Sequence, residues 1–174
     1  YTPDASRSAE WNRGAYLAEA LGHCGECHTP RTALQALNNK RKFSGGMAEG
    51  WRAYNLSSDK DSGIGTWSAE DMENYLKTGH SEDRGSAFGP MAQAVHLSFQ
   101  KLTPSDVKAI VTYVRSVPPV ATPDLPAPKL EAASANPSEH AAAESNSRGH
   151  LMFASVCAGC HSWTGTGSYV PHTT

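Results

Sequence analysis

Two short motifs of cysteine and histidine have a spacing that could attach a metal-containing group. Cys24-Gly25-Glu26-Cys27-His28 lies near the start of the chain, and Cys157-Ala158-Gly159-Cys160-His161 lies near its end. Two thiols separated by two residues can bond to the two vinyl groups of one porphyrin, and the adjacent histidine then falls beneath the iron. The motifs therefore predict two sites of covalent haem c, with the cysteines as attachment points and His28 and His161 as axial ligands.

Two other kinds of site also use paired cysteines. One pair could form a redox-active dithiol, and the two pairs together could supply four thiolates to a structural zinc ion. Neither alternative explains why a histidine follows each pair. The two motifs contain all four cysteines of the chain, which favours haem attachment over both alternatives.

The composition of the 174-residue chain limits the classes of function. Apolar residues make up 39% and aromatic residues 8%, which is little for a packed core, but a buried porphyrin would add apolar surface to it. The formal net charge of −2 predicts no general affinity for nucleic acid. No apolar run approaches the roughly 20 residues needed to span a bilayer, and no signal peptide is recognisable. Since covalent haem c is normally attached outside the bacterial cytoplasm, we expect a mature or truncated chain.

Apolar residues recur at helical spacing in three segments, which predict helices over residues 9–21, 68–79 and 103–117. The first predicted helix leads directly into the first motif. Ser68 and Asp71 approximate a capping box at the start of the second helix, and Gly79 ends it. Thr103 begins the third helix, with Pro104 in its first position. Because no alternating apolar pattern competes with these segments, we expect a mainly α domain, with the first and third helices packed across each other.

Residues 31–65 are rich in glycine, asparagine, serine and lysine, which predicts loops wrapped around the haem edge. Several side chains in these loops are candidate contacts for the haem propionates: Trp51, Tyr54 and Asn55 as hydrogen-bonding groups, and Arg31 or Arg41 as neutralising charges. For each of them, a packing or solvated role is an equally good interpretation.

The remaining iron ligands can be sought in the same domain. The carbonyl of Pro30 is a candidate acceptor for the Nδ1 proton of His28, although Pro30 could instead only stiffen the loop. Met91, in the sequence Phe88-Gly89-Pro90-Met91, is the predicted sixth ligand on a glycine- and proline-turned loop. Its thioether is a soft, neutral ligand that raises the iron potential. His80, His96 and Met47 remain alternatives, whereas Met72 belongs to a helical core.

The composition changes after residue 117. Residues 118–146 are mostly proline, alanine, serine and glutamate, which is typical of an extended linker. We therefore expect a haem domain in residues 1–118, a linker in residues 119–147 and the start of another haem domain in residues 148–174. That last part should begin with a short helix over residues 148–156. We expect it to continue beyond this sequence, because few residues follow His161 to supply a distal ligand.

The sequence around the motifs resembles the second haem domain of the three-haem cytochrome c subunits of bacterial membrane-bound dehydrogenases. The resemblance is carried by Tyr16-Leu17 and residues 22–31, 50–59 and 63–65, with Gly89-Pro90-Met91 and Leu102-Thr103. Residues 157–163 resemble the start of that family's third haem domain. The resemblance implies a class I cytochrome c-type fold and a third haem in the complete subunit.

It also implies a non-catalytic role in electron transfer. Electrons would pass from a catalytic dehydrogenase subunit toward ubiquinone at the periplasmic face of the bacterial inner membrane. Contact with the membrane would come from parts of the subunit not present in this chain.

Two branches of this family differ in their catalytic partner. One partner is a quinoprotein alcohol dehydrogenase, and the other is a molybdenum and iron–sulfur aldehyde dehydrogenase or related hydroxylase, with a small iron–sulfur subunit. Residues 54–59, Thr78-Gly79-His80 and residues 160–163 look more like the molybdenum branch. The predicted partner is therefore an aldehyde dehydrogenase.

Functions of other classes make different demands on the sequence. No nucleophile with an adjacent base and no paired carboxylates stand out, so nothing indicates a substrate site. A dihaem peroxidase is the rival enzyme hypothesis, and it needs one haem with an open or displaceable distal position. A haem-based sensor is a third hypothesis, but the sequence shows no output module.

Overall fold

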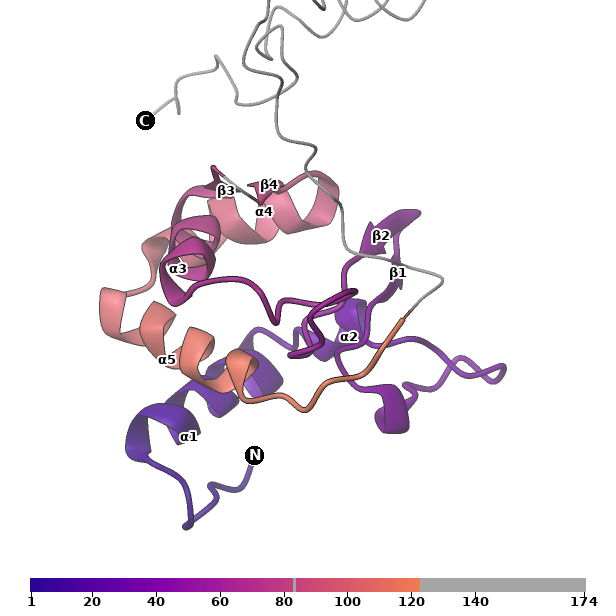
Figure 1. The fold of residues 1–174 in the computed structure, drawn as a ribbon, viewed down its shortest axis with the longest axis horizontal. Coiled ribbons are helices and arrows are strands. Elements are labelled where there is room, and N and C mark those ends of the chain that lie inside the picture. Colours follow the sequence, from indigo (N-terminus) through magenta and orange to yellow (C-terminus); the bar gives the residue numbers. More distant parts are fainter. Residues whose placement is uncertain (83, 123–174) are drawn as a thin grey trace, which may run out of the picture.

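Helices make up most of the regular structure in the computed structural model, which describes residues 1–82 and 84–122 (Figure 1). The second motif, the predicted helix before it and the predicted linker from residue 123 onward lie outside the described residues. The described α-helices are α1 (Ala9–Tyr16), α2 (Gly25–His28), α3 (Ala69–Thr78), α4 (Gly89–Leu97) and α5 (Pro104–Arg115). Shorter helical turns are the π-helical η1 (Leu17–Leu21) and the 3₁₀ turns η2 (Asn39–Arg41) and η3 (Phe99–Lys101). Two antiparallel hairpins complete the described part, β1 (Gly46–Ala48) with β2 (Trp51–Ala53) and β3 (His80–Ser81) with β4 (Gly85–Ser86).

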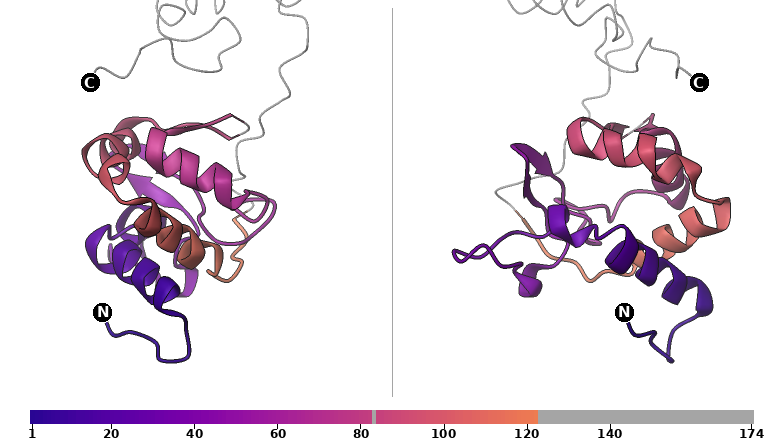
Figure 2. Two further views of the ribbon diagram at one scale, coloured as in Figure 1. Left: turned by 90° about the vertical axis from the view of Figure 1, so that its left-hand side faces the viewer. Right: turned by 180° about the vertical axis from the view of Figure 1, so that it is seen from behind.

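The first and last of these helices pack against each other, as predicted (Figures 1 and 2). A Cβ atom on Gly14 would lie 1.8 Å from the carbonyl oxygen of Ala109, so the two backbones touch at this point. Around it, Arg13 forms a two-pronged ion pair with Asp106 at 2.7 and 3.1 Å. The Trp11 indole donates to Ser116 Oγ at 2.6 Å. The crossing is therefore fixed both by backbone contact and by side chains on each side of it.

Caps confirm the predicted starts of the second and third helices and the predicted end of the second, whereas α5 ends at Arg115 rather than at residue 117. Ser68 Oγ accepts from the Asp71 N–H and the Asp71 carboxylate accepts from the Ser68 N–H, both at 2.9 Å, which completes the capping box at the start of α3. Gly79 ends α3 in the left-handed conformation at φ +75°. Thr103 caps α5 by accepting from the Asp106 N–H. Residues 9–21 are helical throughout, but the last turn widens from α to π at η1.

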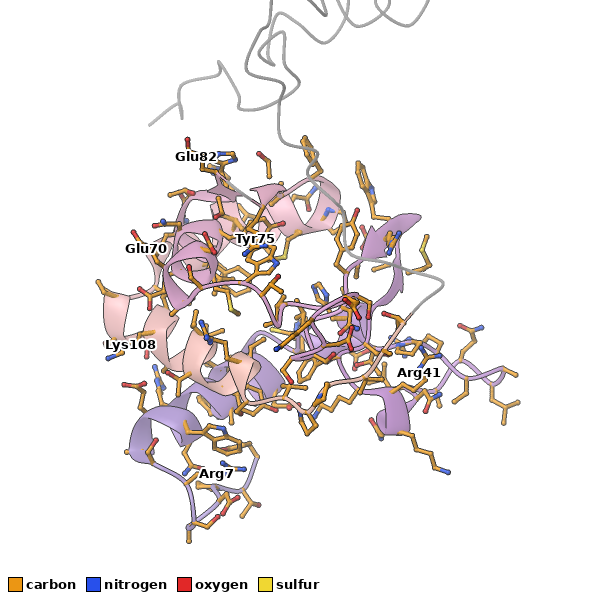
Figure 3. The ribbon with its side chains drawn as sticks, in the orientation of Figure 1. Arg7, Arg41, Glu70, Tyr75, Glu82 and Lys108 are labelled. Atoms are coloured by element: carbon orange, nitrogen blue, oxygen red, sulfur yellow. The ribbon has the colours of Figure 1, made fainter. Side chains whose placement is uncertain are left out.

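The apolar core lies between α1, α3 and α5. Met72 is buried there at 8% exposure, which confirms its predicted place in a helical core. The core comprises Ala15, Leu17, Ala18, Phe43, Ile64, Met72, Ile110, Val111, Tyr113, Val114 and Val117. Figure 3 shows Tyr75 on the inner side of α3, with Arg7, Arg41, Glu70, Glu82 and Lys108 around the periphery.

Several regions differ from the sequence-based prediction, and the β3–β4 hairpin is one of them. Residues 31–65 contain the β1–β2 hairpin and η2 in addition to loops. Residues 89–91, predicted as a turned loop, instead form the first turn of α4. Pro90 suits that position because a first-turn residue needs no N–H partner inside the helix. Within residues 1–82 and 84–122, no helix has the length and apolarity to cross a membrane.

Candidate functional site

The first cysteine–histidine motif lies on a single helical turn. The chain enters it from η1, where the Cys24 N–H donates to the Ala18 carbonyl at 2.9 Å. Cys24 caps α2, and the His28 N–H donates to the Cys24 carbonyl at 3.0 Å. Residues three and four positions apart share one face of a helix, so Cys24, Cys27 and His28 are neighbours along that face. A flat ligand that lay against this face could therefore meet both thiols and the imidazole.

The imidazole of His28 is oriented by a backbone carbonyl from elsewhere in the chain. Its Nδ1 lies 2.7 Å from the carbonyl oxygen of Tyr54, just after β2. The prediction that Pro30 supplies this carbonyl is wrong, because the Pro30 oxygen accepts instead from the Asn38 N–H at 2.9 Å. With a proton on Nδ1 donated to Tyr54, the Nε2 lone pair of the neutral ring is available to a metal.

The charge state of His28 agrees with this role. Burial lowers the pKa of His28 below its ordinary value, although the hydrogen bond to the Tyr54 carbonyl acts in the opposite direction. The ring is therefore neutral at neutral pH. A neutral imidazole is the form that binds metals.

The Cys24 thiol does not have the lowered pKa of a redox-active cysteine. Burial raises the pKa of Cys24 to about 11, with the Glu19 carboxylate adding to the effect. Glu19 lies on η1, where it accepts from the Tyr113 hydroxyl and pairs with Lys42. Because reactive dithiols need a lowered pKa, the dithiol alternative is disfavoured at this motif.

A series of contacts connects the motif to the segment that bears Met91. A Cβ atom on Gly46, in β1, would lie 2.8 Å from the Cys27 carbonyl oxygen, so the hairpin starts directly on α2. At the other strand, a Cβ on Gly89 would lie 2.5 Å from the Trp51 ring, so β2 reaches the first turn of α4. Met91 is half-buried in that turn. The β1–β2 hairpin thus adjoins both α2 and the N-terminal end of α4 (Figure 1).

Of the alternative sixth ligands, Met47 follows Gly46 on the strand that packs against α2, and the two histidines lie on other elements. Met47 is on β1 and 63% exposed. His80 is on β3, where its Nδ1 lies 2.9 Å from Ser86 Oγ. His96 is exposed near the end of α4, with Nδ1 3.2 Å from Gln100 Nε2. Met91 stays the predicted ligand.

The candidate propionate contacts do not form one group. Arg31 pairs with Glu26 at 2.7 Å, and Arg41 is exposed on η2. Trp51 and Tyr54 are half-exposed, with Arg52 over the Tyr54 ring at 4.8 Å. Asn55 is 3% exposed, and its amide bonds to other parts of the chain rather than pointing to the motif.

The residues at this site fit covalently attached haem c. Two thiols and an imidazole whose Nδ1 is held by the Tyr54 carbonyl lie on one helical turn, which is the donor set that the group requires. Large apolar side chains nearby are also exposed, including Trp51, Tyr54 and Phe88. Exposed apolar surface around a site is typical of a surface that binds a ligand or partner.

Comparison with known proteins agrees with this assignment. The sequence pattern of the family described as Cytochrome c matches residues 12–118. The chain belongs to the cytochrome c family. Proteins of this family carry covalently bound haem c, and the first motif and both helices of the crossing lie inside or across the matched range.

The cytochrome is similar to subunits of several dehydrogenases. It is 42% identical over 179 residues to the fructose dehydrogenase cytochrome subunit of Gluconobacter japonicus, covering 97% of this chain and 36% of that protein. It is 41% identical over 163 residues to a nicotinate dehydrogenase subunit of Pseudomonas putida, covering 93% of this chain and 13% of that protein. It is 39% identical over 127 residues to the cytochrome c subunit of the quinone alcohol dehydrogenase of Gluconacetobacter polyoxogenes, covering 69% of this chain and 27% of that protein. The chain thus spans little more than a third, or less, of the length of these relatives.

Proposed function

We propose that this cytochrome transfers electrons within a membrane-bound dehydrogenase complex and performs no substrate chemistry of its own. The observation that carries the proposal is the geometry at the first motif. Cys24, Cys27 and His28 share one helical turn, and the Tyr54 carbonyl at 2.7 Å from Nδ1 orients the His28 ring so that Nε2 can bind a metal. Haem c, once attached, supplies an iron that alternates between the ferrous and ferric states.

An electron-transfer haem must be attached to the protein and its iron must be ligated, and residues of this chain can do both. The two cysteines fix the cofactor covalently, and His28 supplies a neutral ligand with a set orientation. We infer that Met91 supplies the second axial ligand from α4. A thioether there favours the ferrous state, which raises the potential. With both axial positions filled, the site would exchange electrons but bind no substrate.

The similar relatives support a partner of the dehydrogenase class. Their names specify fructose, nicotinate and alcohol, yet their identities to this chain all lie between 39% and 42%. Since such different substrates go with similar identities, the shared part of these proteins carries no obvious substrate specificity. What a cytochrome subunit can share across these complexes is the movement of electrons away from the catalytic subunit.

The identity of the catalytic partner, the electron acceptor and the location are proposed from the sequence resemblance. We propose an aldehyde dehydrogenase partner with a small iron–sulfur subunit, ubiquinone as the eventual acceptor and a location at the periplasmic face of the inner membrane. The quinoprotein alcohol dehydrogenase branch is the alternative. The sequence of the large subunit that co-purifies with this chain distinguishes the two, because a quinoprotein partner would overturn the aldehyde assignment.

The proposal is tested by following the haem spectrum in the complex purified with its partner. Adding the partner's substrate should reduce the haem, and adding a ubiquinone analogue should then reoxidise it. An artificial acceptor that takes electrons directly from the catalytic subunit serves as the control for partner activity. A haem that stays ferric while the partner turns over with the artificial acceptor would contradict the proposal. Peroxide-dependent turnover by the isolated chain would favour the peroxidase hypothesis instead.

A further inference from the structure

The segment that leaves α5 lies along the loop of residues 55–62. The Ser58 N–H donates to the Val117 carbonyl at 3.2 Å, and the Val120 N–H donates to Ser57 Oγ at 3.0 Å. The Thr122 N–H donates to Ser62 Oγ at 2.9 Å. Residues 117–122, the exit segment, are therefore joined to the domain, although the sequence assigns residues from 119 onward to the linker.

Asn55 is the centre of this junction. Its Nδ2 donates to the Val120 carbonyl at 2.7 Å and to Thr122 Oγ1 at 3.0 Å, and it lies 3.2 Å from Ser62 Oγ. Its Oδ1 accepts from the Ser57 N–H at 2.7 Å. Asn55 and Thr122 are 3% and 4% exposed, so losing these bonds would leave buried polar groups without partners.

The peptide group between Tyr54 and Asn55 connects this junction to the first motif. Its carbonyl oxygen is the acceptor 2.7 Å from His28 Nδ1. The same peptide packs against Gly45, where a Cβ would lie 3.3 Å from the Asn55 nitrogen and 3.4 Å from the Tyr54 carbonyl carbon. Gly45 in turn donates its N–H to the His28 carbonyl at 2.9 Å. The peptide is thus confined between the motif and the Asn55 side chain.

We propose that Asn55 is a positioning residue that couples the exit segment to His28 through the Tyr54–Asn55 peptide. A displacement of the exit segment would pull on Asn55 and lengthen the hydrogen bond from His28 to the Tyr54 carbonyl. A weaker bond makes the imidazole less basic toward iron, which stabilises the ferric state less and raises the potential. In the sequence, the exit segment leads toward the second motif, so the position of the residues beyond Thr122 would influence the first site. The inference rests on haem attachment at Cys24 and Cys27 but not on the dehydrogenase partner.

The test uses the full haem-loaded chain with Asn55→Ala and Thr122→Val. Asn55→Ala should raise the reduction potential of this haem and speed the solvent exchange of the His28 Nδ1 proton, measured by NMR. Thr122→Val is nearly isosteric and removes one acceptor, so it should shift both quantities in the same direction by less. Thr112→Val is the matched control, because the Thr112 hydroxyl is also hydrogen-bonded, here as a donor to Glu10 at 2.6 Å, but at the α1–α5 crossing. It should leave the potential and the exchange rate unchanged.

Two results would overturn the coupling. One is a lower thermal stability of Asn55→Ala with unchanged potential and proton exchange, which would make the junction purely structural. The other is an equal reduction potential and an equal exchange rate of the His28 Nδ1 proton in Thr122→Val and Thr112→Val. This comparison tests the coupling even where Asn55→Ala fails to fold. A pyridine haemochrome spectrum of the wild-type chain shows whether haem is attached, so it distinguishes an error in the proposed coupling from an error in the haem assignment. A chain without covalent haem would overturn the haem assignment together with this inference.

Discussion

Replacing Gly14 with alanine tests the packing of α1 against α5, the crossing from which the chain leads into the first motif. A Cβ there would lie 1.8 Å from the Ala109 oxygen, 2.4 Å from its carbonyl carbon and 2.9 Å from Tyr113 Cβ. Two of these atoms are backbone, so an ordinary contact of about 3.4 Å requires the helices to separate by more than an ångström. Overpacking of this kind costs about 3 kcal/mol at the upper end of its usual range, against a gain of at most about 1 kcal/mol from helix propensity. We expect a net loss of about 2 kcal/mol.

The assay is thermal unfolding of the haem-loaded chain, monitored by circular dichroism. A loss of this size should lower the midpoint of thermal unfolding by about 8 °C. Gly25→Ala is the matched control, because its Cβ would meet nothing closer than Thr29 Oγ1 at 3.4 Å, and the second motif has Ala158 at the same position. It should change stability by about 1 kcal/mol or less. Equal stability of Gly14→Ala and wild type would refute the backbone contact between α1 and α5.

Two further substitutions test the sixth ligand and an ion pair at the helix crossing. Met91→Ala should keep the covalently bound haem but lower its potential, because water or a histidine would replace the thioether. Met47→Ala should leave the potential unchanged. A potential that falls in Met47→Ala but not in Met91→Ala would make Met47 the ligand. The hydrogen bond from Arg13 lowers the pKa of Asp106, so this pair stabilises the fold above about pH 4 and loses its effect as pH falls through the folded-state pKa. Asp106→Asn should therefore be less stable than wild type at neutral pH but not in acid, and a difference that persists in acid would contradict this origin.

The helices that the sequence predicts well are those with local signals at both ends. Ser68 and Asp71 cap each other through atoms only three residues apart, and Gly79 supplies the left-handed residue that ends α3. Thr103 similarly caps the start of α5. Because these interactions are local, their pattern is visible in the sequence.

Elements that depend on distant contacts could not be predicted in this way. β3 and β4 are two residues each, too short for any periodicity. The first turn of α4 is fixed in place by the Trp51 ring against Gly89, a contact between segments far apart in the sequence. In sequence alone, glycine and proline at its start indicate a turned loop equally well.

The candidate site combines a local motif with partners from distant segments. The spacing of Cys24, Cys27 and His28 follows from one helical turn, so the motif could be recognised from sequence. The hydrogen-bond partner of His28 lies 26 residues away in Tyr54 and is a backbone atom, which no residue type identifies. The polar side chain of Asn55 makes it a candidate haem contact in the sequence, but in the structure its amide nitrogen donates to Val120 and Thr122 at the end of the domain.

Mass spectrometry of the proteolytic peptide that contains residues 24–28 decides whether haem is attached at the first motif. We expect one haem bonded through thioethers to both Cys24 and Cys27, with a matching pyridine haemochrome spectrum of the intact chain. Free thiols in this peptide that react with an alkylating reagent, together with stoichiometric zinc in the purified chain, would contradict haem attachment.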